Sequence, residues 1–156
     1  MPTVYIETTV VSYLTAAPRR DLIVAAHQQI TREWWETRRP LYDVLVSEVV
    51  LQEIRAGDPE AARRRLEEVE GIRLLAFNDE INSLARAYQA ELQLPPRSAN
   101  DVLHIAFAVA YEVDFLLTWN CAHIANGTTI QRLAVANQRL GLATPVIVTP
   151  EELMAD

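Results

Sequence analysis

Short apolar runs suited to β-strands alternate with longer helical patterns along this chain, and this alternation limits the fold more than any other feature. The runs are rich in β-branched residues and lack polar alternation; they are Thr3–Ile6, Asp43–Val46, Ile72–Leu75, Phe115–Thr118 and Pro145–Val148. Strands of this kind are covered on both faces, as in parallel sheets. The sequence therefore predicts an α/β fold with a central, mostly parallel five-stranded sheet.

The intervals between the runs carry helical periodicity with recognisable ends. The expected helices are a turn around Ser12, then Asp21–Arg38, Ser47–Ala56, a helix opened by Asp58-Pro59-Glu60, Asn78–Leu92, Ser98–Glu112 and Thr128–Leu140. Gly57 and Gly141 are natural helix stops, Ser98 is a candidate cap, and Thr149–Glu152 fits a capping box. No repeat or linker interrupts the pattern, so we expect one domain over residues 1–156.

The fourteen basic residues are all arginine, and the absence of lysine excludes several classes of enzyme. P-loop phosphate binding and Schiff-base chemistry both need a lysine. The net charge of −7 argues against a protein that coats nucleic acid, although clusters such as Arg63–Arg65 leave local RNA binding open. Cys121 has no partner for a disulfide, and no secretory signal or membrane span is visible, so we expect a cytoplasmic protein.

Polar side chains follow the predicted strands at the sheet edge where ligands of open parallel sheets bind. Glu7 directly follows the first strand and Asn120 follows the fourth. Glu53 lies in the helix after the second strand, and Asp101 lies in the first turn of the apolar helix. Taken alone, Asp101 could complement a helix dipole and Glu53 could face solvent. Glu7 is harder to explain in this way, because a carboxylate behind an apolar strand needs a cation, an arginine or a helix to satisfy it.

The three carboxylates are more informative as a group. Brought together, they would repel one another and raise one another's pKa values unless a divalent cation neutralised them. Oxygen ligands of this kind favour Mg²⁺ or Mn²⁺, which supports phosphodiester hydrolysis by acidifying a bound water and stabilising charge on the phosphate. The residues therefore predict a metal centre built on Glu7, Glu53 and Asp101.

Three segments resemble the motifs of the PIN domain, the fold of VapC-type toxin ribonucleases. They are VYIETTVVSYL, SEVVLQEIRAGD and ANDVLHIAFAVAYEVDFLLTWNCAHIAN. The family's acidic and hydroxyl positions fall, in chain order, on Glu7, Thr8, Glu53, Asp101, Thr118 and, with an amide in place of the fourth acid, Asn120. The resemblance implies a three-layer fold with helices on both faces of the sheet. It also implies Mg²⁺- or Mn²⁺-dependent cleavage of single-stranded RNA, a homodimer and an antitoxin partner.

Two positions depart from the family's usual residues. Glu7 stands in place of the usual aspartate and extends the carboxylate by one methylene, which would shift the metal. Asn120 can offer an amide oxygen but adds no charge. The departures could mean weaker metal binding, a preference for Mn²⁺, or a site without activity.

Three further residues are candidates near these positions. His123 stands where many family members carry an aromatic residue; it could contact the scissile phosphate, but we expect it to hydrogen-bond within its loop. His104 shares a helix face with Asp101, and beside hard oxygen donors we expect a buried, hydrogen-bonded histidine and not a metal ligand. Arg97 is the candidate for a phosphate contact.

The leading hypothesis is a PIN-like endoribonuclease, the toxin of a toxin–antitoxin pair. Its three carboxylates hold one or two cations, Asn120 is an auxiliary ligand or positions water, and Thr8 and Thr118 orient the ligands. The alternative is a catalytically inactive PIN-like module that binds RNA or a protein partner, which the departures at Glu7 and Asn120 would favour.

Overall fold

The sheet is parallel throughout, and its strand order places the first strand in the centre. The computed structural model describes residues 1–154. Its strands, β1 (Thr3–Ile6), β2 (Asp43–Ser47), β3 (Arg73–Leu75), β4 (Phe115–Leu117) and β5 (Val146–Val148), lie in the order β3-β2-β1-β4-β5. All four strand pairs are parallel. The predicted α/β fold with a five-stranded sheet is confirmed, and the last two residues of the expected 1–156 domain lie outside the described part.

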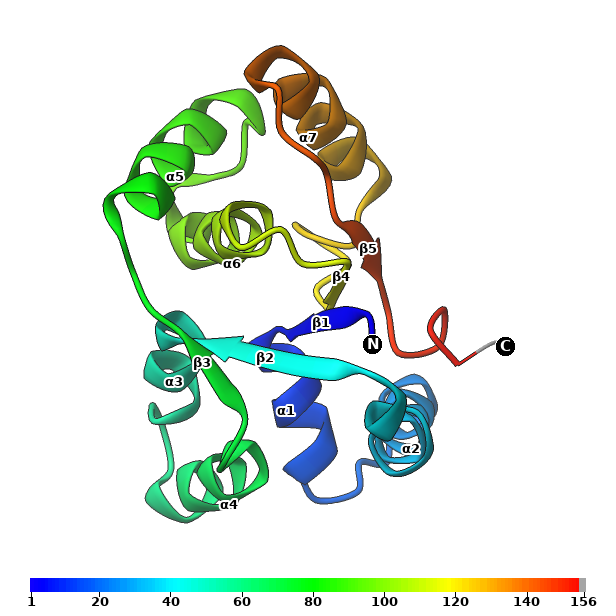
Figure 1. Cartoon of the computed structure of the whole chain (residues 1–156). Coiled ribbons are helices and arrows are strands. Elements are labelled where there is room, and N and C mark those ends of the chain that lie inside the picture. The colour runs from blue at the N-terminus through cyan, green and yellow to red at the C-terminus, as the bar shows by residue number, and fades with distance from the viewer. Residues whose placement is uncertain (155–156) are drawn as a thin grey trace.

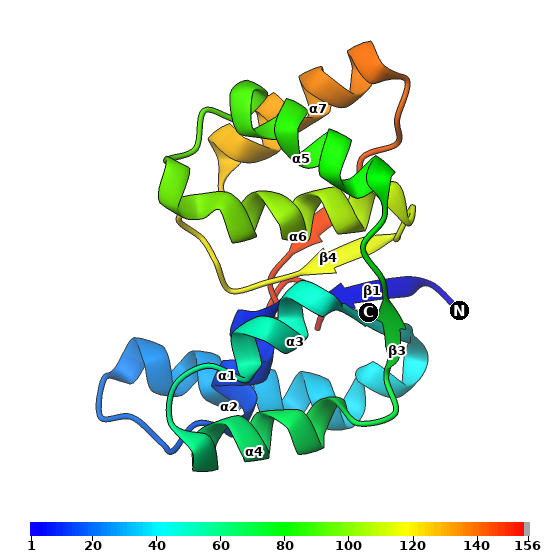
Figure 2. The same ribbon diagram turned by 90° about the vertical axis from the view of Figure 1, so that its left-hand side faces the viewer.

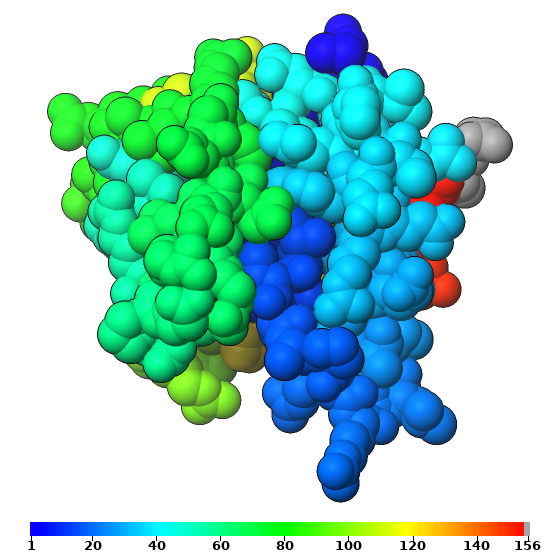
Figure 3. Space-filling model, turned by 90° about the horizontal axis from the view of Figure 1, so that it is seen from below, coloured from blue at the N-terminus to red at the C-terminus, as the bar shows by residue number. Residues whose placement is uncertain are grey.

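Seven α-helices, together with two 3-10 turns at Arg39–Leu41 and Pro96–Ser98, connect the strands in residues 1–154. They are α1 (Thr8–Thr15), α2 (Leu22–Thr37), α3 (Glu48–Ile54), α4 (Pro59–Val69), α5 (Asp79–Glu91), α6 (Ala99–Ala110) and α7 (Gly127–Leu140). Helices α1, α2 and α4 cover one face of the sheet, and α5, α6 and α7 cover the other (Figures 1 and 2). On the first of these faces, α1 lies between α2 and α4 (Figure 3). The three-layer arrangement agrees with the resemblance.

Helix α3 lies where the two helical layers meet. It follows β2 directly and contacts α1 and α4 of one layer as well as α6 of the other. A side chain on α3 can therefore reach residues of both layers. This position brings Glu53 close to segments that are far from it in sequence.

Helix ends follow the expected capping chemistry at most positions. The side chains of Asp58 and Asn126 accept backbone N–H groups at the starts of α4 and α7. Gly141 ends α7 in the left-handed conformation, with a φ of 70°. Thr149 and Glu152 form the two reciprocal bonds of a capping box, at 2.9 and 3.3 Å, around a short turn, as the sequence predicts.

The prediction that Ser98 caps the apolar helix is wrong. Ser98 occupies the residue before α6 but makes no capping bond with its side chain. The 3-10 turn ahead of α6 gives Ser98 a ψ of 22°, whereas a capping serine needs an extended backbone. Its Oγ lies instead 3.2 Å from Nδ1 of His123.

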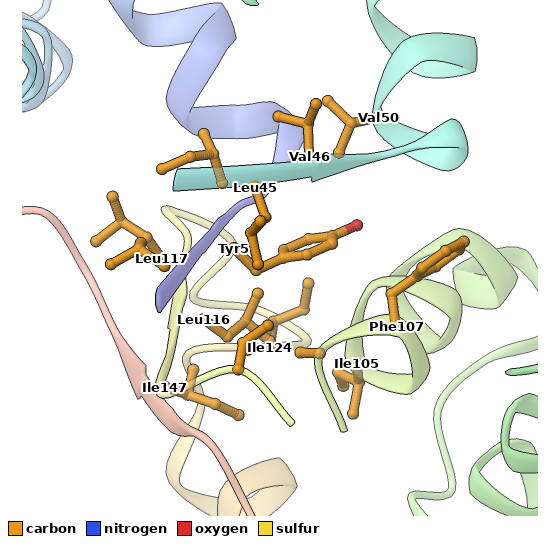
Figure 4. Close-up of a cluster of buried hydrophobic side chains, with 14 of the residues drawn as sticks. Tyr5, Leu45, Val46, Val50, Ile105, Phe107, Leu116, Leu117, Ile124 and Ile147 are labelled. Carbon is orange, nitrogen blue, oxygen red and sulfur yellow. The ribbon is translucent and has the colours of Figure 1, made fainter. Parts of the chain in front are cut away.

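The apolar core fills both spaces between the sheet and the helices. It includes Tyr5, whose hydroxyl group makes hydrogen bonds inside the core. Tyr5 of β1 is fully buried, and its ring is surrounded by apolar side chains of β2, β4 and α6 (Figure 4). The ring of Phe107 on α6 stacks near it, with centroids 6.5 Å apart. No helix within residues 1–154 combines the length and apolar character that a membrane crossing needs.

Candidate metal centre

Glu7 lies between β1 and α1, at the carboxyl end of the central strand. Its backbone N–H continues the sheet by donating to the carbonyl oxygen of Leu117, at 3.0 Å. The residue is only 2% exposed, and its side-chain Oε1 accepts hydrogen bonds from the hydroxyls of Thr118 (2.6 Å) and Thr9 (2.5 Å). Because both bonds reach the same oxygen, the carboxylate is held in one orientation with Oε2 facing His104.

Glu53 projects from α3 toward the same place. Its Oε1 accepts a hydrogen bond from the hydroxyl of Thr8, at 2.7 Å, and lies 2.5 Å from Nε2 of His104. Its Oε2 is 3.5 Å from the side-chain nitrogen of Asn100. Glu53 is therefore not a solvent-facing side chain without partners, because residues of α1 and α6 both hydrogen-bond its carboxylate.

His104 lies fully buried on α6, with both ring nitrogens engaged. Its Nε2 contacts Glu53 and is 4.0 Å from Oε2 of Glu7. Its Nδ1 is 2.7 Å from the hydroxyl of Tyr5, which is in turn 2.7 Å from Oγ of Ser47. A buried hydrogen-bonded chain thus runs from the start of α3, through the central strand, to the carboxylates. The prediction of a hydrogen-bonded histidine in the apolar helix is confirmed.

Glu53 and His104 shift each other's pKa values. Burial alone would lower the pKa of His104, but the hydrogen bond to Glu53 and the charges of the neighbouring carboxylates raise it above its ordinary value of 6.5. Burial alone would raise the pKa of Glu53, but its hydrogen bonds and the charge of His104 lower it below its ordinary value of 4.5. Burial, with the charges of Glu7 and Glu53, raises the pKa of Tyr5, whose hydroxyl therefore stays neutral.

Asp101 and His123 form a second, adjoining group. Asp101 lies in the first turn of α6, one helical turn before His104, and its Oδ2 is 3.0 Å from Nδ1 of His123. Both side chains are partly exposed, so they lie at the rim of the buried cluster. The amide oxygen of Asn120 accepts the backbone N–H of His123, at 3.0 Å, and fixes the start of this loop. The sequence predicts that His123 hydrogen-bonds within its loop; its backbone N–H does so, whereas its side chain bonds Asp101 and Ser98 outside the loop.

The donor set fits a divalent cation. Ligand atoms of Glu7, Glu53 and His104 all lie within 4.8 Å of one another, and the described residues give Asp101 no place in this tightest group. Within residues 1–154, the ion pairs of the three carboxylates are with histidines only. Buried carboxylates without an arginine or lysine partner are costly, and a bound cation would offset that cost.

The other residues that the sequence singled out lie around this cluster. Thr8 and Thr118 each bond one carboxylate, as the prediction of orienting hydroxyls required. Arg97 lies exposed on the 3-10 turn before α6, one residue from Ser98. Sequence analysis gave no role to Thr9, Tyr5 or Ser47. A tyrosine inside an apolar central strand was the one available signal, because a buried hydroxyl needs partners.

Stability of the metal-free protein should depend on pH through the Glu53–His104 pair. The raised pKa of His104 means that its contribution is complete below its ordinary value of 6.5 and is lost as the pH rises through the raised value. The lowered pKa of Glu53 means that its contribution is complete above 4.5 and is lost as the pH falls. We therefore expect the melting temperature, measured in chelator, to fall on the alkaline side.

A matched pair of variants tests this expectation. His104→Gln should flatten the alkaline fall, whereas His27→Gln should preserve it, because His27 stacks on Trp119 with ring centroids 4.0 Å apart and has no carboxylate partner in residues 1–154. Equal alkaline falls in wild type and His104→Gln would contradict the assignment.

Comparisons with known proteins agree with this architecture. The sequence model of the PIN domain matches residues 4–120, a range that contains all of the carboxylates described above. One similar solved structure, VapBC2 from Rickettsia felis bound to a DNA fragment from their promoter, is 14% identical, with a TM-score of 0.60 over 94% of this chain and 98% of that one. Another, FitAB bound to an IR36 DNA fragment, is 12% identical, with a TM-score of 0.60 over 98% and 97%. No curated protein matches the chain.

Proposed function

Because this chain belongs to the PIN domain family, we propose that it is a metal-dependent endoribonuclease that cleaves single-stranded RNA, the toxin of a toxin–antitoxin pair. The observation that carries the proposal is the convergence of Glu7 and Glu53 on one buried cluster without an arginine partner in the described residues. A bound Mg²⁺ or Mn²⁺ ion would supply an acidified water and neutralise charge on the phosphate.

Some side chains of this site would bind the metal ion, and others would position those ligands. Glu7 and Glu53 are the proposed ligands, and Asp101 adds a third carboxylate at the rim. Thr8 and Thr118 hold two of these carboxylates through bonds of 2.7 and 2.6 Å, which keeps ligand atoms in place without adding charge.

The loop after β4 would face the substrate. Asn120 positions this loop, since its amide oxygen accepts the N–H of His123. Because Nδ1 of His123 donates to Asp101, this partly exposed ring would donate to a phosphate oxygen through its other nitrogen in the imidazolium form, which carries a proton on both nitrogens. Arg97, exposed on the neighbouring turn, is the proposed second phosphate contact.

An antitoxin partner and a homodimer belong to the proposal through the resemblance to VapC-type toxins. The likeness of the fold to VapBC2 supports this part, since the two chains match over nearly their full lengths. A second candidate is a PIN module without activity. The contact of the Asn120 amide oxygen with a backbone N–H favours it, because that oxygen is then engaged away from a cation.

Cleavage of a mixed single-stranded RNA pool separates the two candidates. Wild-type protein should cleave with Mn²⁺ or Mg²⁺ and stop cleaving in chelator. Asp101→Asn should lose this activity, whereas Asp79→Asn should keep it, because Asp79 is likewise a first-turn aspartate but lies exposed on α5. Full metal-dependent cleavage by Asp101→Asn would refute the assignment of the site. Absence of cleavage in every condition would favour the module without activity.

A further inference from the structure

His104 contributes a nitrogen atom to a cluster whose other members are carboxylates. It is the fully buried histidine of α6, and its Nε2 points at the carboxylates, 2.5 Å from Glu53 and 4.0 Å from Glu7. Each ring nitrogen has one hydrogen-bond partner, Tyr5 at Nδ1 and Glu53 at Nε2. Nε2 also lies where ligand atoms of Glu7, Glu53 and His104 come within 4.8 Å of one another, which a histidine that only stabilised the apolar helix would not need.

The partner of Nδ1 decides whether Nε2 can bind a cation. An imidazole binds a metal through a nitrogen that carries no proton, so the proton must lie on the other nitrogen and needs an acceptor there. The partner here is the Tyr5 hydroxyl, at 2.7 Å, which can either donate or accept. Its own neighbour, Ser47 Oγ at 2.7 Å, can also take either role.

Two proton arrangements are therefore open to the same set of heavy atoms. Without a cation, Nε2–H donates to Glu53 and Nδ1 accepts from Tyr5. With a cation, Nδ1–H donates to Tyr5, which donates to Ser47, and Nε2 offers its lone pair to the ion. A carboxylate beyond Nδ1 would accept a proton but could not donate one, and a backbone carbonyl likewise. The hydroxyl chain permits both arrangements without movement of the backbone.

We propose that Nε2 of His104 is a ligand of the cation, so that the ion is held by two carboxylates and one imidazole. This inference rests on the proposed metal-dependent function and specifies its ligands; Asp101, outside the tightest group, then acts at the rim. Tyr5 and Ser47 are positioning residues that fix the tautomer. The sequence predicts a buried, hydrogen-bonded His104; this proposal adds that the same nitrogen binds the cation when one is present.

The two carboxylates and the imidazole together determine which metal ion the site prefers. Carboxylates and water suit Mg²⁺ and Mn²⁺ alike, whereas imidazole nitrogen suits transition ions and binds Mg²⁺ poorly. A site with one imidazole should therefore select Mn²⁺ over Mg²⁺. Loss of the imidazole should remove much of that selectivity while leaving the carboxylates in place.

Pulsed electron paramagnetic resonance of bound Mn²⁺ tests the proposal, because it detects ¹⁴N coupling from a coordinated imidazole. The chain has three histidines, so a tag-free His27→Gln/His123→Gln variant keeps His104 as the only one. We expect the ¹⁴N signal in wild type and in this double variant, and its loss in His104→Gln with Mn²⁺ still bound. Competition titrations should show the preference for Mn²⁺ over Mg²⁺ falling by roughly tenfold or more in His104→Gln, at least the effect of losing an outer partner.

The Tyr5→Phe variant tests whether Tyr5 orients His104 without itself binding the metal. This test remains valid even if His104→Gln fails to fold. Removing the hydroxyl should lower Mn²⁺ affinity by about 10- to 100-fold and keep the ¹⁴N signal. Bound Mn²⁺ without a ¹⁴N signal in the double variant would overturn the inference and leave the proposed nuclease intact. A signal that depends on His123 would also overturn it. Failure of wild type to bind Mn²⁺ would overturn both.

Discussion

Replacing Glu7 with glutamine is expected to abolish RNA cleavage and metal-induced stabilisation while raising the melting temperature of the metal-free protein. Glu7 is 2% exposed, and its neighbours in the cluster include a second carboxylate. Glutamine keeps an oxygen that can accept the bonds from Thr9 and Thr118 but removes the buried charge. Without metal, the variant should gain about 1 kcal/mol, or ~2–4 °C for a chain of this size.

The loss of activity should exceed the roughly 10- to 100-fold effect of removing an outer partner, because Glu7 is a proposed ligand. Thermal melts in chelator measure the expected rise in melting temperature, and melts in millimolar Mn²⁺ measure the expected loss of stabilisation by metal. RNA cleavage is measured on the same preparation. Glu33→Gln on α2 is the matched control, since it is exposed and changes the net charge equally. A Glu7→Gln protein that is still stabilised by Mn²⁺ would show that the cation binds elsewhere.

Replacing Phe107 with alanine is expected to cost about 3–5 kcal/mol of folding free energy, the largest stability loss among the changes considered. Phe107 is fully buried, and its ring packs against Phe77 (centroids 5.0 Å apart) and Tyr111 (6.2 Å). In a chain of this size the loss corresponds to roughly 6–20 °C in melting temperature. Urea unfolding in chelator measures it directly.

Phe107 also stacks near Tyr5, so its loss should loosen the hydroxyl that holds His104. Mn²⁺ affinity should therefore fall along with stability. Phe77→Ala is the control: Phe77 packs on the same ring but is only partly buried and makes no ring contact with Tyr5 among the described residues. If Phe77→Ala lowered stability and Mn²⁺ affinity as much as Phe107→Ala, the losses could not be attributed to the fully buried Phe107 ring beside Tyr5.

The sheet was readable from the sequence because each strand is a short, mostly apolar run. The first strand was predicted to the residue, Thr3–Ile6, and the stop at Gly141 follows from the tolerance of glycine for a positive φ. Both features depend on the residues of the segment itself. The Ser98 cap failed for the opposite reason, because its backbone is set by the 3-10 turn that precedes α6 and not by the helix pattern itself.

The carboxylates of the site were found from the sequence, but the contacts between them were not. Their position after strands or at helix starts placed Glu7 and Asp101 at one edge of the sheet. The pairing of Tyr5 with His104 joins residues 99 positions apart, and no local pattern specifies which side chain a buried hydroxyl meets. The oxygen donors were therefore predictable, whereas the proposed nitrogen donor depends on the packing of α6 against β1.

The central place of β1 in the sheet determines when the site can form during protein synthesis. Residues 3–6 leave the ribosome early, but β1 pairs on one side with β4 at residues 115–117. Until that strand follows, Glu7 lacks both the neighbour that receives its backbone N–H and the hydroxyl of Thr118. A nascent chain thus carries scattered acids and no assembled cluster. The ribonuclease proposed above would therefore be unable to cleave its own messenger RNA until residues 115–118 have left the ribosome.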